Sequence, residues 1–182
     1  GKVLPITLIE AGPIFITQIK TKEKDGYEAV QVGYGHAKKL TKPEKSHLKN
    51  NQPLKFLKEV KIPLEEMKTG DSFDVSVFSE GDILKISGVS KGRGFQGAVK
   101  RHGFAGMPSS HGHKHVKRHV GSIGQRFPQH TLKGMRMAGH MGVKRTTIRG
   151  LKVVKIDKDN NLLAVKGAVP GRKGTLLEIY GN

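Results

Sequence analysis

The feature that most constrains the fold of this chain is a window of 74 residues, Ile83 to Ile156, that contains no carboxylate. The window holds 16 of the 33 Lys and Arg residues, so its formal charge is +16, and the other 108 residues together carry only +2. Because like charges repel, such a segment resists compaction unless a dense array of negative charge neutralises it. The window therefore predicts an extended element that binds a polyanion, with phosphate backbone as the obvious candidate.

Length and composition limit the rest of the molecule. The 182 residues suffice for one domain with a hydrophobic core and an appendage. The absence of cysteine excludes disulfides and thiolate metal sites. The longest apolar-looking run, Val3 to Ile9, is far too short to cross a bilayer, so we expect no membrane contact.

Both ends of the chain carry the patterns of short strands separated by turn residues. The predicted strands are Val3 to Glu10, Ile14 to Lys20, Val30 to Tyr34, Phe73 to Val77, Ile83 to Val89, Leu151 to Ile156, Leu162 to Lys166 and Thr175 to Tyr180. We expect the first two to be antiparallel neighbours, and the fourth and fifth to form a hairpin through Glu80-Gly81-Asp82. A Pro- and Lys-rich excursion at about 36–63 allows one short helix, Pro43 to Lys49, with Thr41 as its cap. Strands and turns this dense favour a small barrel or sandwich.

Residues 90–149 show neither helical nor strand periodicity. The segment cannot bury enough apolar surface to offset the entropy cost of ordering it, so we expect it to be largely disordered alone. We therefore predict a β-domain made of residues 1–89 and 150–182, with residues 90–149 inserted as an extended basic finger.

Gly92 to Gly97 match the pattern G-x-G-x-x-G after a predicted strand, which raises the possibility of a dinucleotide site. The residues that follow predict no amphipathic helix, and no acid that could bind a ribose occurs before Asp157. We interpret the glycines as sites where backbone approaches phosphates closely, with Lys91 and Arg93 supplying charge. A simple flexible hinge is the alternative.

Four histidines, His111, His113, His115 and His119, lie within nine residues, and the first three would share one face of an extended chain. Zinc or nickel binding is thus an alternative, although carboxylates to orient the ligands are absent nearby. We favour stacking on bases and hydrogen bonds to phosphate or ribose. The window also has no local acid to complete a catalytic triad, so we predict no enzyme activity, no cofactor and no metal.

Aromatic residues are sparse in the window, where Phe95, Phe104 and Phe127 are the only ones. Sequence-specific readers of single-stranded RNA usually have more aromatic side chains for base stacking. Recognition should therefore depend on charge and shape, with the phenylalanines as wedges or, alternatively, as anchors of the finger's root.

Several motifs resemble, in order and over nearly the whole chain, the universal large-subunit ribosomal protein L3 family of the bacterial type. They are Leu4 to Pro13, KGRGFQGAVKRHGF at Lys91 to Phe104, Ser110-His111-Gly112, HVGSIGQ at His119 to Gln125, KGMRMAGHMG at Lys133 to Gly142, and NLLAVKGAVPG at Asn161 to Gly171. The resemblance implies a mainly β fold: a small translation-protein-type β-barrel with a long, irregular, basic inserted extension.

The resemblance also implies a function. The chain would be a structural constituent of the large ribosomal subunit that binds 23S-type rRNA, supports early assembly and shapes the peptidyl transferase centre. Its partners would be large-subunit rRNA and neighbouring ribosomal proteins, with no membrane and no small-molecule substrate. Its location would be cytoplasmic and ribosome-bound, or on an organellar ribosome.

Charge and resemblance together predict the residues that contact rRNA, with the finger's tip around Ile123 to His130. The predicted rRNA-binding residues are Lys91, Arg93, Lys100, Arg101, His102, His111, His113, Lys114, His115, Lys117, Arg118, His119, Arg126, Phe127, Gln129, Lys133, Arg136, Lys144 and Arg145.

Two departures from the family pattern are visible. Family members usually begin some twenty residues earlier with a further strand, so we expect an N-terminal segment to be missing. A segment of that length is enough for one ordinary strand and its connection. Some bacterial members carry a methylated glutamine near the tip, where this chain has Phe127, so we predict no such modification there.

Overall fold

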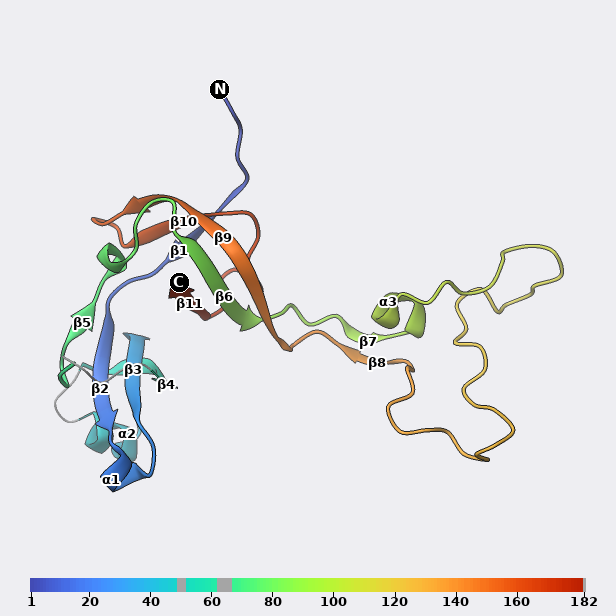
Figure 1. The fold of residues 1–182 in the computed structure, drawn as a ribbon, viewed down its shortest axis with the longest axis horizontal. Coiled ribbons are helices and arrows are strands. Elements are labelled where there is room, and N and C mark those ends of the chain that lie inside the picture. The colour runs from blue at the N-terminus through green and yellow to red at the C-terminus, as the bar shows by residue number, and fades with distance from the viewer. Residues whose placement is uncertain (49–51, 62–66, 182) are drawn as a thin grey trace. The chain divides into compact units, whose positions relative to one another are not determined.

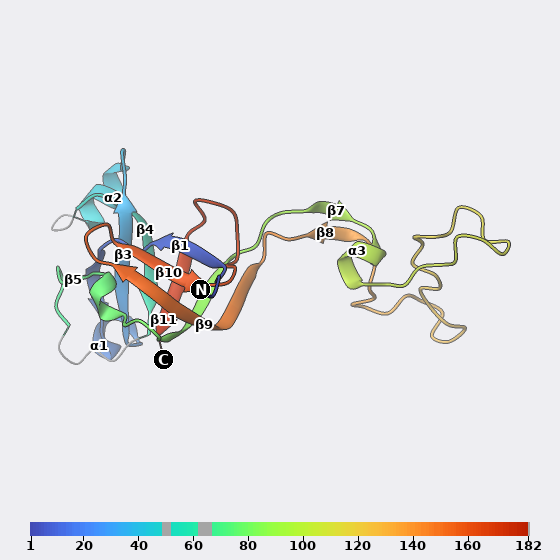
Figure 2. The ribbon, with the colours of Figure 1, turned by 90° about the horizontal axis from the view of Figure 1, so that it is seen from above.

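The computed structural model describes residues 1–48, 52–61 and 67–181, and it divides into two compact units. Unit 1 comprises Gly1–Lys85, Arg149–Val169 and Ile179–Asn182. Unit 2 comprises Ile86–Ile148 and Pro170–Glu178. Arrows dominate the ribbon in Figures 1 and 2, so the predicted mainly β class is confirmed.

The strands form three sheets. The five-stranded sheet has the order β1 (Ile6–Glu10), β10 (Leu162–Lys166), β9 (Arg145–Asp157), β6 (Ile83–Val89) and β11 (Leu177–Gly181). The four-stranded sheet has the order β4 (Leu54–Val60), β3 (Ala29–His36), β2 (Ile14–Lys20) and β5 (Ser72–Phe73). A two-stranded ribbon joins β7 (Gly94–Gln96) and β8 (Gly139–Met141). Within the described ranges these sheets are open, so the closed barrel in our prediction is not supported.

The first two strands were correctly located but wrongly paired. β1 is antiparallel to β10, with Leu8 opposite Ala164, whereas β2 pairs with β3 and β5. Hydrogen bonds from Ala11 N–H to the Asn161 carbonyl (2.9 Å) and from Gly167 N–H to the Pro5 carbonyl (2.9 Å) hold both ends of β1 against β10. Residues 11–13 therefore connect two sheets and do not close a hairpin.

The predicted strand from Phe73 to Val77 is also wrong. Only Ser72–Phe73 is extended, as β5, and Val75–Val77 form a 3₁₀ turn, η1. Val75 is buried while Val77 is 64% exposed, so these residues do not share a buried strand face. The expected hairpin with β6 is therefore absent from this described segment, because β5 pairs with β2.

The Pro- and Lys-rich excursion contains the predicted helix and a strand that we missed. Helix α2 (Lys42–His47) begins at Thr41, whose side chain and that of Glu44 form a capping box; the Thr41 N–H to Glu44 Oε2 distance is 2.7 Å. Lys49 lies outside the described residues. Strand β4 pairs with β3 in an antiparallel register, and its mostly exposed, lysine-containing sequence concealed it.

The hydrophobic core of unit 1 consists of β-branched and Leu side chains. Ile16 and Val30 are fully buried in the four-stranded sheet, and Leu84, Val153 and Leu163 are at most 1% exposed in the five-stranded sheet. The remaining helices, α1 (Lys22–Asp25) and α3 (Ala98–His102), are a single turn or little more. Over the part of the chain that the structure describes, no helix is long and apolar enough to cross a membrane.

Candidate nucleic-acid interface

The two ends of the predicted finger are joined by backbone hydrogen bonds within unit 2. Ser90 N–H donates to the Lys144 carbonyl (2.9 Å), Val143 N–H donates to the Ser90 carbonyl (3.2 Å), and Arg93 N–H donates to the Met141 carbonyl (2.9 Å). Beyond them, β7 and β8 pair from Gly94 opposite Met141 to Gln96 opposite Gly139. The finger thus starts as a short β-ribbon, which the lack of periodicity had hidden.

The ribbon gives the G-x-G-x-x-G pattern a structural role. Gly94 begins strand β7, and Gly97 is the N-cap of α3. The sequence predicted no amphipathic helix after the motif, and the helix that follows, α3, has only five residues and ends at Gly103, which adopts a left-handed conformation. A helix this short lacks the βαβ context in which the pattern binds a dinucleotide.

Glycine is required at two close approaches of backbone to backbone in unit 2. Gly142 has φ of +86°, and a Cβ added there would lie 2.1 Å from the Lys91 carbonyl oxygen. Gly106 has φ of +76°, and its Cβ would lie 2.2 Å from the Lys117 carbonyl oxygen, which accepts the Met107 N–H at 3.0 Å. Any side chain at these two positions would meet backbone and would also strain its own backbone.

Arg101 and His102 contact the protein itself. The Arg101 Nη1 donates to the Met137 carbonyl oxygen at 2.7 Å, and the His102 Nε2 lies 3.0 Å from the same oxygen. Arg101 also covers Gly139, where an added Cβ would be 2.8 Å from Nη1. Both side chains are half-buried. Their contacts with Met137 hold α3 against the segment that leads into β8. Their predicted contacts with rRNA remain a prediction.

The histidine cluster is not extended. His111 and His115 have positive φ values of 58° and 56°, and a turn lies at residues 111–112. The expectation that alternate histidines share one face therefore fails, because left-handed residues redirect the chain. Among the described residues, no group of three or more His, Asp or Glu side chains is arranged to hold a metal ion.

The other predicted contact residues are exposed along an irregular path. Between α3 and β8 the chain has no helix or strand, and Ala98 is the only buried residue from 90 to 149. In Figure 1 this path is the yellow and orange loop between the labels α3 and β8. The exposed residues are Lys91, Arg93, Lys100, His111, His113, Lys114, His115, Lys117, Arg118, His119, Arg126, Phe127, Gln129, Lys133, Arg136, Lys144 and Arg145.

Two of these side chains have partners that the sequence did not reveal. Arg126 lies over the ring of Phe127, 5.8 Å from its centroid, and Phe127 is 67% exposed. Arg145 forms a salt bridge with Glu178. A carboxylate 33 residues away in the sequence therefore neutralises one of the predicted cations.

Comparisons with known proteins agree with this picture. The family model described as ribosomal protein L3 matches residues 55–162. The large ribosomal subunit protein uL3 of Herpetosiphon aurantiacus is 48% identical over 184 residues, covering 98% of this chain and 87% of that protein. The uL3 of Thermosipho melanesiensis is 50% identical, covering 98% and 88%. The uL3c of Guillardia theta is 46% identical, covering 98% and 90%.

Fold, exposed polycationic segment and relatives together define a structural protein of the ribosome and not an enzyme. The chain belongs to the ribosomal protein L3 family, as its motifs predicted. The expected ribosome-bound, cytoplasmic location agrees with this membership, and the organellar alternative agrees with the relative named uL3c.

Proposed function

We propose that this chain is a constituent of the large ribosomal subunit that binds 23S-type rRNA through residues 90–149. Unit 1 provides a folded base, and the inserted segment provides reach. Through that segment the protein supports early subunit assembly and the architecture around the peptidyl transferase centre, with residues 123–130 nearest to the catalytic RNA. Neighbouring ribosomal proteins pack on unit 1.

The observation that carries the proposal is the combination of charge and exposure in residues 90–149. The segment contains 13 Lys and Arg residues and no carboxylate, and only Ala98 in it is buried. Apart from the salt bridge between Arg145 and Glu178, the described residues offer these cations no carboxylate partner. A polyphosphate supplies the missing negative charge, and release of the condensed counterions then drives binding.

Burial within RNA would also supply the order that the segment cannot supply itself. The irregular path between α3 and β8 has few backbone hydrogen bonds and no hydrophobic core, so its ordering entropy must be offset by contacts with a partner. Folded rRNA offers both phosphates and enclosing surfaces. The segment therefore suits a role in supporting the shape of the RNA better than a role in catalysis.

The test is the salt dependence of binding by the full chain to folded bacterial large-subunit rRNA. Replacing Lys100, Lys117 and Arg118 by Ala should flatten the log-log slope by roughly 0.7 to 0.9 per lost phosphate contact. The matched control is a variant with Lys22, Lys24 and Lys58 of unit 1 changed to Ala, which removes the same charge. An equal change in both slopes would contradict a specific role for residues 90–149.

A second comparison distinguishes the proposal from a general nucleic-acid chaperone. A chaperone would bind duplex DNA and small-subunit rRNA as tightly as large-subunit rRNA at the same salt concentration. We expect a preference for the large-subunit rRNA that persists when salt is raised, because shape as well as charge contributes to recognition.

A further inference from the structure

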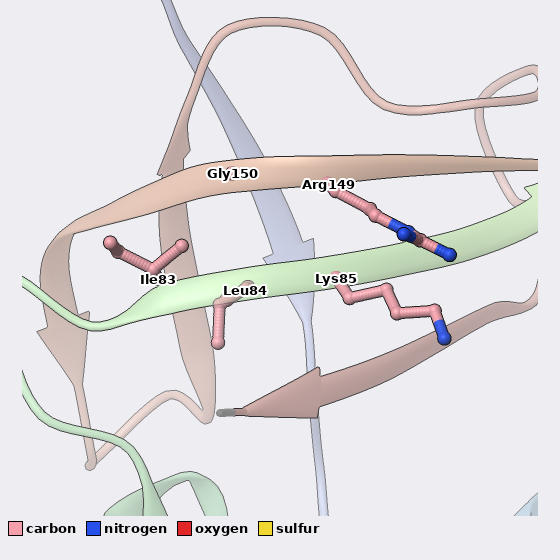
Figure 3. A pocket seen from close by; sticks show the side chains of 5 residues that line it. All are labelled: Ile83, Leu84, Lys85, Arg149 and Gly150. Carbon is pink, nitrogen blue, oxygen red and sulfur yellow. The ribbon is translucent and has the colours of Figure 1, made fainter.

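A second cationic site lies in unit 1, at the base of the predicted finger, whose last residue is Arg149. A cavity of about 410 Å³ is lined by Ile83, Leu84 and Lys85 of β6 and by Arg149 and Gly150 of β9. Figure 3 shows the side chains of Lys85 and Arg149 extending in the same direction from their two strands, so their charged ends lie on the same side. Neither residue was among the contacts predicted from the sequence.

The pleat of β6 determines which side chains face this cavity. Leu84 and Ile86 are at most 1% exposed, whereas Ile83 is 53% exposed and Lys85 is exposed. Because alternate residues of a strand point to opposite faces, the core holds Leu84 and Ile86 and thereby fixes Ile83 and Lys85 toward solvent. The cavity is thus positioned by rigid sheet and not by a loop.

Gly150 keeps the β9 side of the cavity open. It has φ of +77°, and a Cβ added there would meet no atom within 4 Å. A left-handed residue within a long strand favours glycine, and the missing side chain leaves free space over the backbone.

The electrostatics of the cavity favour an anion. All five lining residues fall in the acid-free window, and within the described part of the chain neither Lys85 nor Arg149 forms a salt bridge. The Lys85 Nζ lies 5.8 Å from the centroid of the Tyr180 ring. Two adjacent positive charges repel each other, and an anion between them relieves that repulsion.

We propose that this cavity binds one nucleotide of the rRNA backbone, with the phosphate between Lys85 and Arg149 and the sugar against Ile83. A guanidinium and an ammonium group together suit a phosphate, which offers several acceptor oxygens. The exposed apolar Ile83 side chain suits the face of a ribose, and the volume lies in the range of small-ligand sites. The proposal rests on the proposed function and extends the rRNA contact to the sheet of unit 1.

The experiment measures binding of the full chain to a folded bacterial large-subunit rRNA transcript as salt is varied. Changing Lys85 and Arg149 to Ala should flatten the log-log slope by roughly 0.7 to 0.9 for each, which corresponds to about 6-fold weaker binding per contact at 0.1 M salt. The variant with Lys152 and Lys155 changed to Ala, which removes two exposed charges on β9 outside the cavity, is the matched control and should change binding less. A thermal melt of each variant checks that unit 1 stays folded.

A photoreactive benzoylphenylalanine at position 83 provides an independent readout in assembled subunits. We expect crosslinks from it to large-subunit rRNA, and crosslinks only to another protein would overturn the proposal in favour of a protein-docking site. If the cavity variants bind normally while the variant at Lys100, Lys117 and Arg118 binds weakly, the cavity proposal alone is wrong. If all of these variants bind normally, the proposed function is wrong as well.

Discussion

Replacing Gly142 by Ala should weaken rRNA binding far more than the same change at Gly134. Both glycines have nearly the same conformation, with φ of +86° and +80°. A left-handed conformation costs an Ala about 1 kcal/mol at either position. At Gly134 a Cβ would meet nothing within 4 Å, whereas at Gly142 it would lie 2.1 Å from the Lys91 carbonyl oxygen and 2.9 Å from the Gly92 Cα.

The larger cost at Gly142 follows from what must move. To accommodate the Cβ, residues 90–93 must separate from residues 141–144. The three backbone hydrogen bonds between these two segments would then be lost or distorted. At a net ~1 kcal/mol each, they add about 3 kcal/mol to the conformational cost. The total of about 4 kcal/mol predicts roughly 10³-fold weaker binding for Gly142→Ala, against about 5-fold for Gly134→Ala.

The assay is equilibrium binding of each full-length variant to folded large-subunit rRNA at fixed salt. The melting transition of unit 1 should be unchanged in both variants, which separates a local defect from global unfolding. Equal losses of affinity for the two variants would refute the reasoning. They would show that the close contact of Gly142 with Lys91 and Gly92 is not needed in the bound state.

Three further outcomes are expected. Leu163→Ala should destabilise the chain by about 2–5 kcal/mol in chemical denaturation, since Leu163 is fully buried, while Leu8→Ala, at a 63% exposed position, should cost much less. Hydrogen bonds from the Thr41 N–H and hydroxyl lower the pKa of Glu44. The stabilisation they provide is therefore present above the unfolded pKa and is lost as pH falls through the lowered folded value. Thr41→Ala keeps the N–H and removes the hydroxyl, so an NMR titration should find the pKa of Glu44 partly restored toward its usual value. An unchanged pKa would show that the hydroxyl does not bind Glu44. An isolated peptide of residues 90–149 should give poorly dispersed, unprotected amide signals, and protected amides throughout would show that it folds without RNA.

Strand positions could be predicted from the sequence where alternation or dense β-branching marks a buried face. β2, β3, β6 and β10 were located in this way, because their side chains fill the core of a sheet. Strand β4 was missed because most of its residues are exposed and carry no alternation. Pairing could not be predicted, since the turn residues after β1 are equally compatible with a hairpin and with a connection between sheets.

The positive charge of residues 90–149 could be predicted from the sequence, and their local geometry could not. The absence of carboxylates located a segment whose Lys and Arg residues are exposed, apart from the half-buried Arg101. Their contacts with rRNA stay a prediction. The sequence did not indicate that Arg101 binds the Met137 carbonyl or that Glu178 pairs with Arg145, since both contacts join residues more than 30 positions apart. It also did not indicate that Lys85 and Arg149 flank one cavity, because adjacency of β6 and β9 is a property of the sheet.

The central claim is that residues 90–149 reach into large-subunit rRNA with their tip at 123–130. The most direct measurement is crosslinking from a photoreactive residue at Phe127, which is 67% exposed and whose ring lies beneath Arg126. In assembled large subunits the account predicts crosslinks to rRNA nucleotides of the peptidyl transferase region. Crosslinks only to proteins, or to rRNA far from that region, would contradict it.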